Sequence, residues 1–62
     1  MIQPKKPIKE ILGDLLMPLL GSQELIDMWW TGQNRAFDFK TPNEMFEIDQ
    51  RRVIDYVKGQ YQ

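Results

Sequence analysis

The 62-residue sequence contains no cysteine and no histidine. Without cysteine the chain has no disulfide, no thiol nucleophile and no thiolate metal ligand. Without histidine it also lacks the commonest general base and the commonest zinc ligand. We therefore expect neither a metal nor a cofactor.

The sequence also lacks an apolar run long enough to cross a membrane. The longest run, Leu15 to Leu20, has six residues and includes Pro18, whereas a membrane-spanning helix needs roughly 20. Charged residues interrupt the apolar stretch that follows Lys5 and Lys6, so the N-terminus matches a secretory signal poorly. We expect a cytoplasmic protein without membrane contact.

An excess of charge of one sign is missing as well. Eight Lys and Arg stand against nine Asp and Glu, which gives a formal net charge of -1. Nucleic-acid binders use a basic field to release counterions from phosphates. We therefore expect no nucleic-acid binding by this chain alone.

The apolar residues that are present predict an all-α fold, a compact bundle of three to four short helices. Residues 1–7, with prolines at 4 and 7, are expected to form an extended lead-in, and residues 8–62 a single helical domain. Six apolar residues recur at the spacing of one helical face, namely Ile8, Ile11, Leu12, Leu15, Leu16 and Leu19. Pro18 is expected to end or bend this first helix near Met17.

A second helix is expected over residues 23–30. Gly21 breaks the first helix, and Ser22 is a good N-cap for the second. Gly32 is expected to end the second helix in the left-handed conformation. The apolar side consists of Leu25, Ile26, Trp29 and Trp30.

The segment Thr41-Pro42-Asn43-Glu44 is the most specific local signal in the chain. The Thr41 hydroxyl can accept a hydrogen bond from the Glu44 N–H, while the Glu44 carboxylate reaches back to the Thr41 N–H. Pro42 suits the first helical position, where no N–H is needed. A third, short helix is therefore expected to begin here.

A fourth helix is expected over residues 50–58. Asp49 can serve as its N-cap and Gly59 can end it. The residues expected to be buried are Val53, Ile54 and Val57. With burial of only about 60% of the unfolded-chain surface at this length, stability depends on helix packing, self-association or a partner.

No catalytic constellation is evident, and we predict that the protein is not an enzyme. The candidate carboxylates are interpreted as solvated helix surface or as charges near helix N-termini. They are Glu24 with Asp27, Glu44 with Glu47, and Asp49 with Asp55. Arg51 and Arg52 are interpreted as surface charges that pair loosely with Asp49 and Asp55; a small basic binding edge is the alternative.

Four aromatic residues fall within eleven positions: Trp29, Trp30, Phe37 and Phe39. Adjacent helical residues point about 100° apart, so one tryptophan is expected in the core and the other at its rim. Trp29 and Phe37 are assigned to the fold. Trp30 becomes a candidate interface anchor, since large aromatic residues dominate interface energetics. Phe39 is open between core and surface.

A recurring pattern is carried by Gly21-Ser22, Trp29-Trp30, Asn34, Ala36-Phe37, Lys40-Thr41-Pro42 and Met45-Phe46, without a gap from Trp29 to Phe46. This pattern resembles the toxin-binding domain of the Xre/MbcA/ParS-like antitoxin family. With the last helix included, the resemblance covers about two thirds of the chain.

The chain departs from that family in three places. Family members often have glycine where this chain has Asp38 and Phe39, and often a glycine within the segment that here reads Asp49-Gln50-Arg51-Arg52. Full-length members commonly carry an N-terminal helix-turn-helix domain that binds their own promoter. About 20 residues precede Gly21, so we expect a stand-alone toxin-binding domain.

The resemblance implies a small helical module that neutralises a toxin enzyme of the RES or a related ADP-ribosyltransferase-like type. It further implies occlusion, in which an aromatic patch docks beside the toxin's cleft and the last helix or tail covers the NAD entrance. The expected partner-binding residues are Trp30, Asn34, Arg35, Phe39, Lys40, Tyr56 and Tyr61. For Asn34, a bond to local backbone is the alternative.

Two other functions are compatible with the sequence. The bulky Phe39 and the missing DNA-binding domain suit a phage or mobile-element inhibitor or adaptor that binds a different host protein. Exposed aromatic residues could also pair with one another in a homo-oligomer.

Overall fold

The computed structural model describes residues 6–61, and its regular structure is entirely helical there. The elements are α1 (Ile8–Leu20), α2 (Gln23–Thr31), the 3-10 helix η1 (Arg35–Phe37), α3 (Pro42–Ile48) and α4 (Gln50–Gly59). The prediction of a small all-α bundle is confirmed. Most of the expected lead-in lies outside the described residues. Of these helices, none combines the length and the apolar character that crossing a membrane requires.

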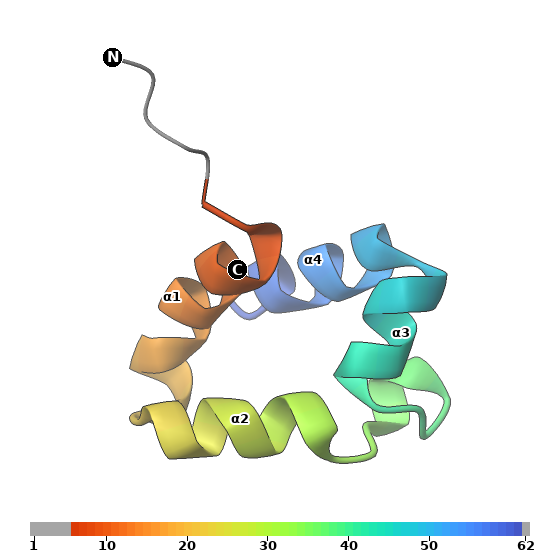
Figure 1. The fold of residues 1–62 in the computed structure, drawn as a ribbon, viewed down its shortest axis with the longest axis horizontal. Coiled ribbons are helices and arrows are strands. Elements are labelled where there is room, and N and C mark those ends of the chain that lie inside the picture. The colour runs from red at the N-terminus through yellow and green to blue at the C-terminus, as the bar shows by residue number, and fades with distance from the viewer. Residues whose placement is uncertain (1–5, 62) are drawn as a thin grey trace.

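The four α-helices form a closed ring around one core. α1 packs against α2 and α4, and α3 packs against the same two helices. Figure 1 shows them as the sides of a square, with α1 opposite α3. Every α-helix and η1 contribute to the core, which consists of Leu12, Leu16, Ile26, Trp30, Phe37, Met45, Val53 and Val57.

The buried face of α1 is narrower than the apolar pattern predicts. Leu12 and Leu16 are buried, but Ile8, Ile11 and Leu19 are between 41% and 44% exposed. The apolar face is covered only in part because the principal neighbours of α1 in the described part of the chain are α2 and α4.

Pro18 does not end α1, which continues to Leu20. A proline inside a helix leaves the carbonyl four residues earlier without its donor. That carbonyl belongs to Asp14, an exposed residue. The helix instead ends at Gly21, whose φ of 96° is left-handed and whose N–H donates to the Met17 carbonyl at 2.8 Å.

The start of α2 follows the prediction, but its end does not. The Ser22 hydroxyl accepts a hydrogen bond from the Leu25 N–H at 3.2 Å, so the N-cap is confirmed. Leu25 itself is 45% exposed, contrary to expectation. Gly32 has φ −91° and ψ 148°, so the expected left-handed ending is wrong. A Cβ at Gly32 would lie 3.1 Å from the Met28 carbonyl oxygen, which favours glycine for space rather than for conformation.

The capping box at the start of α3 is confirmed. The Glu44 N–H donates to the Thr41 hydroxyl at 3.0 Å, and the Thr41 N–H donates to the Glu44 carboxylate at 3.1 Å. The hydrogen bond from the Thr41 N–H, and after it a side-chain hydrogen bond with Thr41, hold the pKa of the Glu44 carboxyl below its ordinary value. The junction of α3 with α4 is a single residue, Asp49, whose carboxylate caps the Arg52 N–H at 3.4 Å.

Candidate functional site

Residues 34–40, here called the 34–40 loop, join α2 to α3 and carry most of the expected partner-binding residues. The loop closes on itself, because the Asn34 N–H donates to the Lys40 carbonyl at 3.0 Å. The N–H groups of Phe37 and Phe39 both donate to the Asn34 carbonyl, at 2.9 and 3.0 Å. The segment is therefore a structured unit rather than an open connection.

At the tip of the loop, two consecutive residues without glycine's freedom are left-handed. Asp38 has φ 57° and Phe39 has φ 66°. The Lys40 N–H donates to the Phe37 carbonyl at 3.1 Å, which together with these angles gives a type I′ turn. A bulky residue in this region of φ is uncommon. The question left open for Phe39 is answered by its 62% exposure, which places it at the surface.

Phe37 anchors the loop from below. It is 1% exposed, so its predicted place in the core is confirmed. Its ring lies 5.2 Å from that of Tyr56 and 6.3 Å from that of Trp29, centroid to centroid. Tyr56 and Trp29 stack on each other with centroids 6.2 Å apart and planes 20° apart. The exposed loop therefore stands on a half-buried aromatic cluster.

The assignment of the two tryptophans is reversed in the structure. Trp30, expected at the rim as a partner anchor, is 8% exposed and packs edge to face against Phe46 at 5.9 Å. It follows Ile26 by one helical turn and so shares its inward face. The Lys9 ammonium covers the Trp30 ring at 5.2 Å. Trp29, expected in the core, is the half-buried rim residue.

The other loop residues divide into one structural residue and two exposed cations. The Asn34 side-chain oxygen accepts a hydrogen bond from the Ala36 N–H at 2.9 Å, which is the local alternative considered for it. Arg35 and Lys40 are exposed. Neither takes part in an ion pair within residues 6–61.

Tyr61 lies apart from the loop. It is 51% exposed and its hydroxyl donates to the Leu15 carbonyl of α1. Tyr56 contacts Phe37 beneath the loop and also lines a groove of about 390 Å³. The groove is lined by Leu16, Leu19, Leu20, Trp29, Tyr56 and Gln60. The sequence placed Leu16 and Leu19 on the apolar face of the first helix and did not indicate a groove there.

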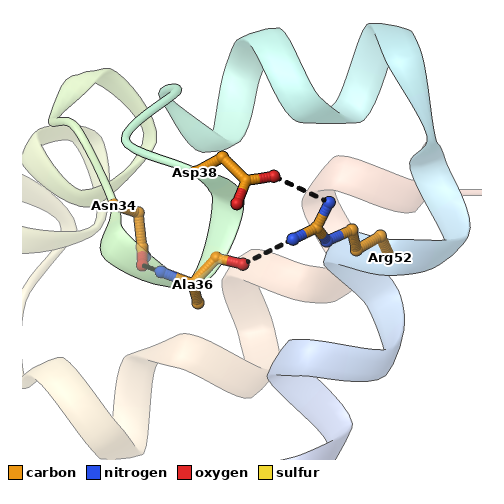
Figure 2. A network of polar contacts seen from close by, with 4 residues as sticks. All are labelled: Asn34, Ala36, Asp38 and Arg52. Atoms are coloured by element: carbon orange, nitrogen blue, oxygen red, sulfur yellow. Dashed lines mark hydrogen bonds and ion pairs between the residues drawn. The ribbon is translucent and has the colours of Figure 1, made fainter.

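Arg52 belongs to the site, whereas the sequence indicated only a loosely paired surface charge or part of a small basic edge. Its guanidinium donates to the Ala36 carbonyl at 3.0 Å and to the Asp38 carboxylate at 3.4 Å (Figure 2). The expected pairing of both arginines with Asp49 and Asp55 is wrong for Arg52, although Arg51 lies 3.9 Å from Asp55. Asp38 and Arg52 are 14 positions apart, so no local spacing could have indicated the contact.

The carboxylates considered for catalysis are all exposed. They lie on helix surfaces or at helix ends and do not share a pocket. Glu44 and Asp49 cap helices, as described above. Asp27 accepts a hydrogen bond from the Gln23 amide at 2.9 Å. Each of these three side chains thus has a local structural role.

The chemistry that the 34–40 loop offers is recognition, through one exposed aromatic ring beside two cationic side chains. Comparisons of the chain with protein-family models, with curated proteins and with solved structures returned no match. The resemblance of residues 21–46 to the antitoxin family is therefore carried by the sequence pattern alone.

Proposed function

We propose that the chain is a non-enzymatic protein-binding module that neutralises a toxin enzyme in the cytoplasm. The observation that carries this proposal is Phe39, a large aromatic side chain held 62% exposed on an ordered loop. A side chain of this size gains most from burial when a second protein covers it. The resemblance supplies the class of partner, a toxin of the RES or a related ADP-ribosyltransferase-like type.

The backbone of the loop supports the comparison with that family. Asp38 and Phe39 both have positive φ. These are the two positions at which family members often have glycine, the residue that adopts positive φ without strain. A shared loop conformation accounts for the glycines of the family and for the strained residues of this chain.

The mechanism that we propose is occlusion. The 34–40 loop docks beside the catalytic cleft of the toxin, and α4 with the residues after it covers the NAD entrance. Tyr56 and Tyr61 lie on this part of the chain, with Tyr61 51% exposed. Burial of the aromatic surface then supplies the affinity, while the protein contributes no chemical step, no cofactor and no contact with nucleic acid or membrane.

Co-expression with a candidate toxin from the neighbouring gene tests the proposal. We expect the wild-type chain to restore growth and to co-purify with the toxin. The variant Phe39→Asn, which suits the left-handed backbone without restoring the glycine of the family, should lose both properties, whereas Met28→Ala, which shortens a side chain of similar exposure (59%) on α2, should keep them. Failure of the wild-type chain to bind any such toxin would count against this function.

An inhibitor or adaptor for a different host protein is the second candidate, and Phe39 is the observation that favours it. Phenylalanine in place of a family glycine changes the surface that a partner meets. A tagged wild-type chain would then retain a stoichiometric host protein that Phe39→Gly does not retain, and the candidate toxin would remain unbound. Self-association is a third possibility, which a monomeric mass by light scattering at high concentration would exclude.

A further inference from the structure

Arg52 connects α4 to the 34–40 loop through hydrogen bonds of its guanidinium group. Among the described residues, no other side chain of α4 forms a hydrogen bond with this loop. The two contacts of Arg52 lie on either side of the buried Phe37, one on the Ala36 carbonyl and one on the Asp38 carboxylate. In Figure 2 both acceptors point toward the guanidinium. A planar guanidinium can hold two such acceptors at a fixed separation, which a lysine ammonium cannot do.

The contacts of Arg52 lie next to the two residues of the loop that have a left-handed backbone. Asp38 begins the left-handed pair, and Phe39 completes it with φ 66°. A non-glycine residue holds such a conformation only when its surroundings impose it. The Phe39 side chain is 62% exposed and contributes little packing of its own, so the support comes from Phe37 beneath the turn and from Arg52 beside it.

Arg52 also sets the charge of the loop. Its contact with Asp38 at 3.4 Å offsets the one carboxylate of the loop. Arg35 and Lys40 have no ion pair among residues 6–61, and the backbone bond between Asn34 and Lys40 brings the two ends of the loop together. Phe39 therefore projects from a loop whose unpaired charges are both positive.

We propose that Arg52 is a positioning residue that holds the 34–40 loop as a preformed knob, and that this knob fits an apolar pocket with an acidic rim on a protein partner. The inference rests on the proposed protein-binding function and names the chemistry of the surface that would be bound. Phe39 fills the pocket, and Arg35 and Lys40 meet the carboxylates at its edge. Complementary charge of this kind speeds association and selects among partners.

Hydrogen exchange in the free protein tests the positioning role. The amides of Phe39 and Lys40 are bonded within the loop, and in Arg52→Gln we expect them to exchange about tenfold faster, the loss of one charged hydrogen bond. The amides of Val53 and Val57 report global unfolding and should change much less. Arg51→Gln is the matched control, since Arg51 forms its ion pair with Asp55 of its own helix and no hydrogen bond or ion pair with the 34–40 loop in the described part of the chain. Equal loop exchange in wild type and Arg52→Gln would overturn the positioning role.

Selection of binders from a library of random peptides tests the chemistry of the partner surface. We expect peptides bound by the wild-type chain to combine large apolar residues with Asp and Glu. Their binding should be lost in Phe39→Gly and about tenfold weaker in Arg52→Gln, because the competent loop is less populated. Arg52→Lys should be intermediate and Arg51→Gln unchanged. Basic or uncharged peptides, no enriched peptide, or binding that is indifferent to Phe39 would overturn the inference.

The two proposals fail in different ways. If the peptides and the loop amides behave as expected while the candidate toxin does not bind, the knob stands and the toxin is the wrong partner. If the toxin binds equally well to wild type and Arg52→Gln, the toxin-binding function stands and Arg52 does not position the loop.

Discussion

Within residues 6–61 the backbone adopts the left-handed conformation at two places, and one of these uses glycine. Gly21 ends α1 with φ 96°. Asp38 and Phe39, at the tip of the 34–40 loop, reach φ 57° and 66° with ordinary side chains. For an L-residue this conformation costs about 1–2 kcal/mol.

The two places differ in what surrounds them. At Gly21 one backbone bond to Met17 closes the turn, and a Cβ on the glycine would meet nothing within 4 Å. Nothing packs there to impose the conformation, so the residue itself must permit it. The 34–40 loop has the buried Phe37, its own backbone bonds and Arg52 to impose it. Strain is thus retained where the structure supports it and where a large side chain is exposed.

Truncation of Phe37, the buried residue beneath the 34–40 loop, should have the largest effect on stability. Phe37→Ala is expected to lower the free energy of unfolding by about 3–5 kcal/mol, the usual cost of emptying a buried phenylalanine site. The total free energy of unfolding of a domain of this length is about 3–9 kcal/mol. Circular dichroism should therefore show a weak thermal transition or none. A melting temperature close to that of the wild type would mean that the loop is held from elsewhere.

Replacement of the glycine at the unsupported turn should have the next largest effect. Gly21→Ala forces a Cβ into the left-handed region and should destabilise the protein by about 1–2 kcal/mol. At about 4–8 °C for each kcal/mol, the fall in melting temperature is easily measured. Gly13→Ala is the control, because Gly13 lies inside α1 with open space around its Cβ. That change should stabilise the protein, by about 0.5–1 kcal/mol.

Introduction of a glycine at the tip of the 34–40 loop should raise the free energy of unfolding, whereas removal of Gly21 lowers it. Phe39→Gly relieves the strained conformation but gives the unfolded chain more freedom, for a net gain of about 0.5–1 kcal/mol. Chemical denaturation measures it, with Phe39→Leu as a control that keeps the strain. A stabilised variant that no longer binds a partner would show that Phe39 is present for binding rather than for folding. A loss of stability would place Phe39 among the residues that support the fold.

The parts of the fold that the sequence predicted correctly are those fixed by neighbours along the chain. The caps at Ser22, Thr41 and Asp49 each bond an amide three residues later, so their spacing alone reveals them. The all-α class follows from helical periodicity in the same way. For Pro18 the sequence left two alternatives, an end or a bend of the helix, and the structure excludes the first because α1 continues to Leu20.

The candidate site depends on contacts between distant segments, and here the sequence was less informative. The choice between Trp29 and Trp30 depends on which face of α2 meets the core, and periodicity placed both on its apolar side. The contact between Arg52 and Asp38 depends on how α4 crosses the loop. The sequence left Phe39 open between core and surface, and no local pattern in it predicted the left-handed backbone of Asp38 and Phe39.

The smallest expected effect concerns the capping box that follows the loop. The hydrogen bonds with Thr41, the backbone bond first, lower the pKa of Glu44 from its ordinary value of 4.5. A carboxyl with a depressed pKa in the folded state contributes stability above its unfolded pKa and loses that contribution as the pH falls through the folded pKa. Glutamine can still accept the Thr41 N–H, so Glu44→Gln removes only the charge-dependent part. The difference in melting temperature between wild type and Glu44→Gln should therefore be greatest near neutral pH and shrink steadily below pH 4.5.

Glu47→Gln removes a carboxylate from the same helix outside the capping box and controls for net charge. A difference that widened toward acid pH would mean that the Glu44 carboxylate opposes the cap, and that the start of α3 relies on the Thr41 hydroxyl alone.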